Sequence, residues 1–134
     1  MTFAASASIA ARSDLVLTKI SPMVVSLAPE SKAEAEQHAK QDAPLEACGL
    51  LVVDAKGKQH YQACQNLCDE PEKHFVLDPV GYYKASLRGK IIAVVHSHPN
   101  GEPPSNMDRK ACKQSKLTWF VYQLPQDEWL IIEP

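Results

Sequence analysis

Five apolar residues, Ile91-Ile92-Ala93-Val94-Val95, run directly into His96-Ser97-His98-Pro99. The apolar run is too short for a typical helix and rich in β-branched side chains, so it predicts a buried strand. Because side chains alternate along a strand, His96 and His98 point to the same side and can reach one metal ion. Pro99 cannot donate a hydrogen bond to a neighbouring strand, and we expect the strand to end there.

A second motif follows after a loop rich in glycine and proline. Ser105 is a good N-cap residue and predicts a helix that runs to about Ser115. Asp108 falls in the first turn of that helix, from which its carboxylate can turn back towards His96 and His98. Two imidazoles and one carboxylate make three ligands for one Zn²⁺ and leave the fourth position to a water. This open set is typical of catalytic zinc, since structural zinc sites are usually closed by four protein ligands.

The whole chain has the composition of one ordinary globular domain. It holds 134 residues, of which 45% are hydrophobic and 22% are charged, and this is enough for a core without disulfides. The formal net charge of -2 gives no reason to expect nucleic acid or an anionic membrane as a partner. The N-terminal segment lacks a basic start and a continuous apolar run. We therefore expect no signal peptide, and a cytoplasmic protein with free thiols.

The rest of the sequence alternates predicted helices and strands, separated by proline, glycine and other turn residues. The expected elements are helices at 30–41 and 80–88, a β-hairpin of 45–53 and 59–64, and strands at 74–77, 117–124 and 129–132. This order predicts an α/β fold, a sandwich in which helices flank a mixed sheet. We expect one domain at residues 30–134. The preceding extension, residues 1–29, forms either one or two edge strands or no regular structure.

Metal-assisted hydrolysis also needs a general acid and base, and two glutamates compete for this role. Glu46 opens a predicted buried strand that we expect to lie next to the strand of His96, and a carboxylate there is costly unless it is paired, solvated or used. Glu102 is nearer in sequence but lies in the loop rich in glycine and proline, where a base is harder to hold, so Glu46 is preferred. The hydroxyl of Ser105 can serve a developing oxyanion or act only as the helix N-cap, and the sequence leaves both roles open.

Other functional patterns are absent or weak. The HxE and PCxxC motifs of zinc deaminases and the HExxH motif of helical metalloproteases do not occur. Cys64 and Cys68 stand in a CxxxC spacing, a weak signal for metal binding or redox chemistry. His38 lies on the predicted helix 30–41 and is expected to face solvent.

The sequence resembles the JAB/MPN metalloprotease family, in particular its bacterial and phage branch. The residues that resemble the family's JAMM motif are Glu46, His96-Ser97-His98-Pro99 and Ser105-Asn106-Met107-Asp108. The likeness runs from about residue 32 to residue 129 and includes 46–51, 64–66, 74–79 and 93–99. One spacing differs, because the family usually has six residues between the proline of HSHP and the serine, whereas this chain has five, Asn100 to Pro104. The spacing from that serine to the aspartate is intact, so we expect the loop to absorb the deletion.

The resemblance implies a cytidine-deaminase-like fold and the hydrolysis of peptide or isopeptide bonds. It implies one Zn²⁺ per chain, held together with a water by His96, His98 and Asp108. It also implies that Glu46 is the general acid and base and that Ser105 assists the oxyanion. Asn66 and His74 match this branch as well, and we assign both to structural roles.

Three functions are compatible with these residues. The first is a zinc metallopeptidase that acts on a peptide or a tail protein in phage or prophage tail assembly. The second is a bacterial protease that processes a ubiquitin-like or sulfur-carrier protein, which a neighbouring gene for a small protein ending in Gly-Gly would favour. The third is a non-catalytic scaffold or binding domain of the tail, against which the complete set of ligands and base argues. No insertion is large enough to grip a folded ubiquitin, so we do not expect a eukaryotic-type deubiquitinase.

Overall fold

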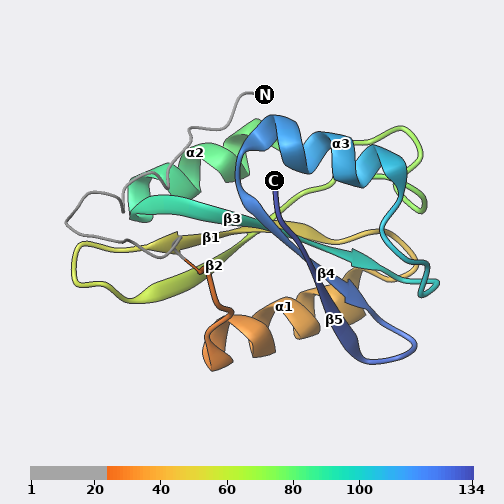
Figure 1. The fold of residues 1–134 in the computed structure, drawn as a ribbon, viewed down its shortest axis with the longest axis horizontal. Helices are drawn as coiled ribbons and strands as arrows, with labels where there is room; N and C mark the ends of the chain where they lie inside the picture. Colours follow the sequence, from red (N-terminus) through yellow and green to blue (C-terminus); the bar gives the residue numbers. More distant parts are fainter. Residues whose placement is uncertain (1–23) are drawn as a thin grey trace.

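The computed structural model describes residues 24–134, which form three helices and a five-stranded sheet (Figure 1). The elements are α1 (Pro29–Asp42), β1 (Cys48–Val53), β2 (Gln59–Cys64), α2 (Pro79–Arg88), β3 (Lys90–His98), α3 (Asn106–Ser115), β4 (Thr118–Gln123) and β5 (Glu128–Ile132). The sheet order is β2-β1-β3-β4-β5, with β3 and β4 parallel and the other neighbours antiparallel. The predicted α/β fold with a mixed sheet flanked by helices is confirmed.

β3 is the central strand, and its sequence explains why. All its residues from Ala93 to His98 are buried, and a strand covered on both faces requires a nearly continuous apolar run. The connection from β3 to β4 passes through α3, since parallel strands need a crossover. The end of β3 and the start of α3 are therefore separated only by the short loop 99–105.

Helices cover both faces of the sheet. Figure 1 shows α2 and α3 on one face and α1 on the other. On the first face, Leu50, Val94 and Val121 belong to one core cluster with Ala85 of α2 and Cys112 of α3. The core cluster under α1 contains Ala35, Leu51, Ala93, Val95 and Phe120.

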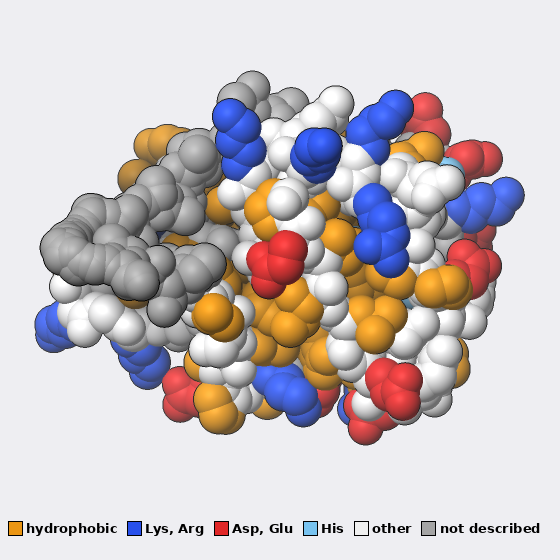
Figure 2. Space-filling model, viewed as in Figure 1, with side chains coloured by type: hydrophobic (Ala, Val, Ile, Leu, Met, Phe, Trp, Pro, Cys, Tyr) orange, Lys and Arg blue, Asp and Glu red, His pale blue; other side chains and the backbone are white. Residues whose placement is uncertain are grey.

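The outward side of α3 is mostly polar, whereas α2 also exposes apolar side chains. In Figure 2, Lys and Arg side chains lie along the upper part of the molecule, where Figure 1 places α2 and α3. α3 contributes the exposed Arg109, Lys110 and Lys113, while Cys112 and Ser115 are buried. This is the pattern of an amphipathic helix packed on a sheet. Within residues 24–134, no helix is both long and apolar enough to cross a lipid bilayer.

The predicted strand at 74–77 is wrong. Only Leu77 forms a β-bridge, with Asn66, and the rest of the segment is irregular. The Asn66 side chain takes the place of a ladder: its Nδ2 donates to the Glu46 carbonyl at 3.0 Å and its Oδ1 accepts from the Val76 amide at 3.1 Å. A short apolar run such as Phe75-Val76-Leu77 is compatible with a strand, but it cannot show whether a partner strand is available.

The extension was expected at residues 1–29, but residues 1–23 lie outside the described residues. Only its last part, residues 24–29, can be compared with the expectation. Residues 24–28 form no strand and lead directly into α1 at Pro29. The side chain of Gln59 fixes them to β2: its Oε1 accepts from the Ala28 amide at 2.8 Å, and its Nε2 donates to the Ser26 carbonyl at 2.9 Å.

His38 does not face solvent, contrary to the prediction from helix composition. Its side chain is 13% exposed, with Nδ1 at 2.6 Å from the Tyr61 hydroxyl and Nε2 at 3.1 Å from Asp42. Burial raises the pKa of Tyr61 well above its ordinary value, so the phenol stays protonated and donates a hydrogen bond to Nδ1. The imidazole is then neutral and donates from Nε2 to Asp42. Such a buried bond lies between α1 and β2 and helps to hold the helix on the sheet.

This arrangement predicts an acid sensitivity that depends on His38. Burial lowers the pKa of His38 despite the opposing effect of Asp42. The unfolded chain takes up a proton at about pH 6.5, whereas the folded chain does so only at lower pH, so stability falls as the pH drops through about 6.5. Thermal melts are recorded at pH 7.5 and pH 5 on protein freed of metal with a chelator. The fall in melting temperature between the two pH values should be smaller for His38→Gln than for the parent. Equal falls in the two proteins would remove this role.

Candidate metal centre

The end of β3 carries two buried imidazoles. His96 and His98 are 1% and 6% exposed, and strand alternation places both on the same face as Val94, towards α2 and α3. Their Nε2 atoms lie 3.2 Å apart. Ser97 between them points the other way, and its Oγ accepts a hydrogen bond from the Ala47 amide at 2.8 Å. This bond ties the end of β3 to the residues that precede β1.

α3 brings a carboxylate to the same point. Ser105 and Asp108 form a capping box, in which each side chain accepts from the other's backbone amide at 3.0 Å. The same carboxylate reaches His96 Nε2 at 3.5 Å and His98 Nε2 at 3.2 Å. Burial acts to raise the pKa of Asp108, but hydrogen bonds from the two imidazoles outweigh it and hold that pKa well below its ordinary value. The structure thus brings an ionised Asp108 to both histidines.

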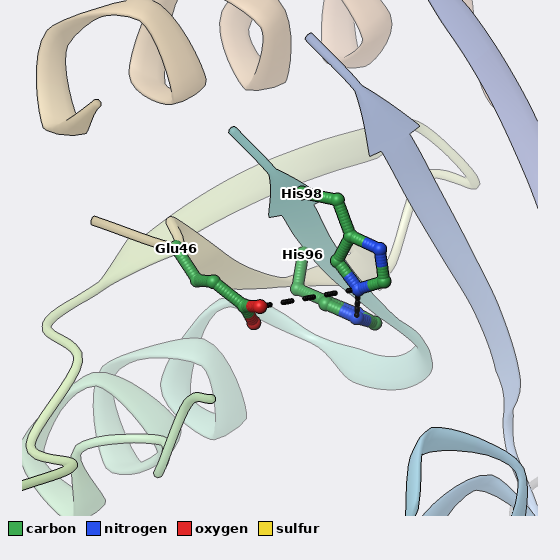
Figure 3. A group of neighbouring side chains, drawn as sticks. All are labelled: Glu46, His96 and His98. Carbon is green, nitrogen blue, oxygen red and sulfur yellow. Dashed lines mark hydrogen bonds and ion pairs between the residues drawn. The ribbon is translucent and has the colours of Figure 1, made fainter. Parts of the chain in front are cut away.

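Glu46 lies beside this group, on the segment that leads into β1. It is 5% exposed, and its amide donates to the Pro71 carbonyl at 2.7 Å while its carbonyl accepts from Asn66. Its Oε2 lies 4.0 Å from His98 Nε2, and Figure 3 shows the carboxylate and both imidazoles pointing towards one another. Burial raises the pKa of Glu46 to about 8, although His98 acts in the opposite direction.

The separations within the group fit a tetrahedral Zn²⁺. Ligand atoms at about 2.0–2.1 Å from a tetrahedral ion lie about 3.3 Å from one another. The two Nε2 atoms lie 3.2 Å apart, and the two oxygens of Asp108 each approach one imidazole, Oδ1 at 3.5 Å from His96 Nε2 and Oδ2 at 3.2 Å from His98 Nε2. One ligand atom each from Glu46, His96 and His98 also lie within 4.8 Å of one another, so this buried trio can hold an ion as well. Glu46 is farther from His98, at 4.0 Å, and fits a place beside the ligands better.

The loop after β3 fixes the orientation of His98. Its Nδ1 lies 2.5 Å from the backbone carbonyl of Glu102. A carbonyl can only accept, so Nδ1 donates to it and Nε2 faces the site. Nε2 donates to Asp108 while the imidazole is protonated, and loss of that proton would free its lone pair for an ion. Gln123 at the end of β4 donates to the same carbonyl at 3.2 Å. Glu102 itself is exposed, so it serves the site through its backbone, and the buried carboxylate beside the imidazoles is that of Glu46.

Aromatic packing holds the other imidazole. The Nδ1 atom of His96 is buried and has no hydrogen-bond partner among residues 24–134. The Phe75 ring stacks on His96 with centroids 4.6 Å apart, and Trp119 meets it edge-on at 5.4 Å. Sequence reasoning did not place these two aromatic residues at the site, because in sequence they look like ordinary core residues. The only available signal was the position of Phe75 within the segment that resembles the family.

Ser105 is exposed. Its hydroxyl oxygen accepts a hydrogen bond from the Asp108 amide, as expected of an N-cap. The structural role expected from the sequence is therefore present, while assistance to an oxyanion stays a prediction. Ser105→Ala should lower the free energy of unfolding by about 1 kcal/mol, the usual loss for a removed N-cap. Urea denaturation measures this, and an unchanged midpoint would contradict the cap. A further loss of about 10²-fold in rate would add the oxyanion role.

Among the described residues, no cysteine belongs to a candidate metal group. Cys48, Cys64, Cys68 and Cys112 are all free. Burial raises the pKa of Cys64 to about 12, so this thiol stays protonated, whereas metal binding and redox chemistry use the thiolate. The weak CxxxC signal gains no support from the structure.

Comparisons with known proteins point to one family. The family described as "Prokaryotic homologs of the JAB domain" matches residues 30–131. The chain is 34% identical over 98 residues to "Tail tip assembly protein K" of Escherichia phage N15, covering 72% of this chain and 40% of that protein. The protein of the same name from Escherichia phage lambda is 41% identical over 46 residues, covering 34% of this chain and 23% of that protein.

The fold has a solved counterpart. The solution structure of protein DSY2949 from Desulfitobacterium hafniense is similar with a TM-score of 0.59 and 26% identity, over 78% of each chain. The chain spans less than half the length of the two phage proteins it matches. The resemblance expected from the JAMM residues is thus confirmed, and this chain belongs to the family of prokaryotic JAB-domain homologs.

Proposed function

We propose that this chain is a zinc-dependent metallopeptidase of the JAMM type that hydrolyses peptide or isopeptide bonds. One observation carries the proposal. The buried carboxylate of Glu46 lies 4.0 Å from the imidazole of His98, and Asp108 contacts the imidazoles of both His98 and His96. A site used only for binding or stability has no need for a buried carboxylate with a raised pKa beside its ligands.

The residues divide the work as follows. His96, His98 and Asp108 would hold the ion. The chemistry that a bound Zn²⁺ supplies is Lewis acidity, which polarises a carbonyl and brings the pKa of water from 15.7 to about 7. Glu46, with a pKa of about 8 that a nearby cation would lower, accepts the proton of the attacking water and passes it to the leaving amine. Burial and the Asn66 hydrogen bond keep its backbone in place.

The biological setting is proposed from the relatives. Two of them carry the name tail tip assembly protein, which supports a role in phage or prophage tail assembly, with a tail protein as substrate, inside the host cell or on the virion tail. The same names favour one second candidate, a tail assembly domain that works by binding alone. Processing of a ubiquitin-like or sulfur-carrier protein stays a prediction that no feature of the fold favours.

Zinc-dependent cleavage separates these candidates. We expect the zinc-loaded chain to cleave members of a pooled peptide library, read by mass spectrometry, with cleavage lost on chelation and restored by added zinc. Binding of peptides without any cleavage, at full zinc occupancy, would favour the assembly domain and overturn the proposed activity.

A further inference from the structure

A cavity of about 450 Å³ lies between α3 and the irregular segment 74–77. This volume falls within the range of about 300–1,000 Å³ that is usual for ligand pockets. Phe75, Ala111 and Trp119 contribute apolar walls, and Asp108 is the one Asp, Glu, Lys or Arg side chain that lines it among the described residues. The lining also includes polar side chains, those of His74, Gln114 and Ser115. The cavity thus offers an apolar group walls on which to pack and polar groups beside them.

The cavity adjoins the candidate metal centre through shared side chains. Asp108 lines the cavity and also contacts both histidines. Phe75 and Trp119 form part of its wall and pack on the ring of His96. A group seated in the cavity consequently lies next to any bond that is held at the ligand atoms.

The rim of the cavity exposes apolar side chains on both sides. Met107 on α3 is 59% exposed, and Val76 on the facing segment is 51% exposed. Exposed apolar residues that flank a pocket mark a binding site more often than those scattered singly. The flexible methionine can adapt to different occupants.

We infer that this cavity binds the side chain of a bulky apolar residue next to the scissile bond of a peptide substrate. The inference rests on the proposed hydrolytic function and adds the class of residue that the site selects. A glycine at that place would leave the apolar walls uncovered, so a Gly-Gly segment is a poor substrate. Each methylene group buried in such a pocket typically changes selectivity about 10-fold or more.

Binding to the cavity can be measured without catalysis. The full chain is labelled with ¹³C at its methionine methyl groups, and the Met107 signal is assigned with Met107→Leu. N-acetyl-phenylalanine amide and N-acetyl-leucine amide should shift that signal saturably, while N-acetyl-glycine amide should not at the same concentrations. Equal shifts with the glycine and phenylalanine amides would overturn the inference.

A matched pair of variants locates the binding. Val76 and Val80 are 51% and 57% exposed, and only Val76 lines the cavity. Val76→Asp should weaken binding of the phenylalanine amide about 10-fold or more, and Val80→Asp should leave it unchanged. Equal weakening in both would show that the amide binds elsewhere.

The two proposals can fail separately. Binding of the phenylalanine amide together with no peptide cleavage at full zinc occupancy would leave the cavity assignment intact and remove the hydrolytic function. Cleavage at bonds flanked equally well by glycine, aspartate or phenylalanine would keep the function and remove the assignment. A second chain or another segment of this protein in the cavity would appear as a shifted Met107 signal that dilution or truncation reverses, with no response to the amides, and that result would also overturn the inference.

Discussion

Glu46→Gln should abolish hydrolysis while zinc content stays near one ion per chain. The amide keeps the shape of the side chain but cannot accept a proton from water or return it to the leaving amine. Loss of a general acid and base costs about 10²–10⁴-fold in rate. The measurement is kcat on a cleaved peptide beside zinc content by elemental analysis of the same sample.

Glu102→Gln is the matched control for this experiment. Glu102 also stands close to the site in sequence, but its contact with His98 comes from the backbone carbonyl, which the substitution preserves. We expect rate and zinc content close to those of the parent. Normal turnover in Glu46→Gln, or an equal loss in both variants, would remove Glu46 from the mechanism.

Asp108→Ala should lose zinc almost completely. Among residues 24–134, the Asp108 carboxylate is the one acidic group with ion-pair contacts to both imidazoles, at 3.5 and 3.2 Å. Replacement of outer-shell partners alone costs about 10–100-fold in metal affinity, so loss of a direct ligand should cost more than about 100-fold. Competition with a coloured chelator at fixed pH gives the affinity.

Ser105→Ala separates the ligand role from the capping role. Both variants remove the capping box of α3, so each should lose about 1 kcal/mol of stability, but only Asp108→Ala should lose zinc. Retention of stoichiometric zinc in Asp108→Ala would show that Asp108 is not a zinc ligand. Zinc loss of similar size in Ser105→Ala would mean that α3 is displaced, and that the effect of Asp108→Ala is indirect.

The elements that build the site could be predicted because their signals are local. The apolar run before His96 specifies a buried central strand, and the side chain of Ser105 starts the next helix. The placement of Glu46 required one non-local guess, that its strand pairs with the histidine strand. The structure has β1 and β3 adjacent, so this guess holds.

The features that the sequence did not predict all depend on contacts between distant segments. The stacking of Phe75 on His96 joins a loop to the central strand, and residue type alone does not distinguish it from core packing. The segment 74–77 looks like a strand but forms only an isolated bridge, between Leu77 and Asn66, and side-chain hydrogen bonds of Asn66 help to hold the loop. His38 was expected in solvent, yet Tyr61 of β2 reaches it from across the chain.

X-ray absorption at the zinc edge of the zinc-loaded full chain tests the proposed metal centre most directly. We expect one zinc per chain with only nitrogen and oxygen neighbours at about 2.0–2.2 Å and the outer scattering of two imidazoles, from His96 and His98. A sulfur neighbour at about 2.3 Å, or a folded protein that takes up no stoichiometric zinc, would contradict it.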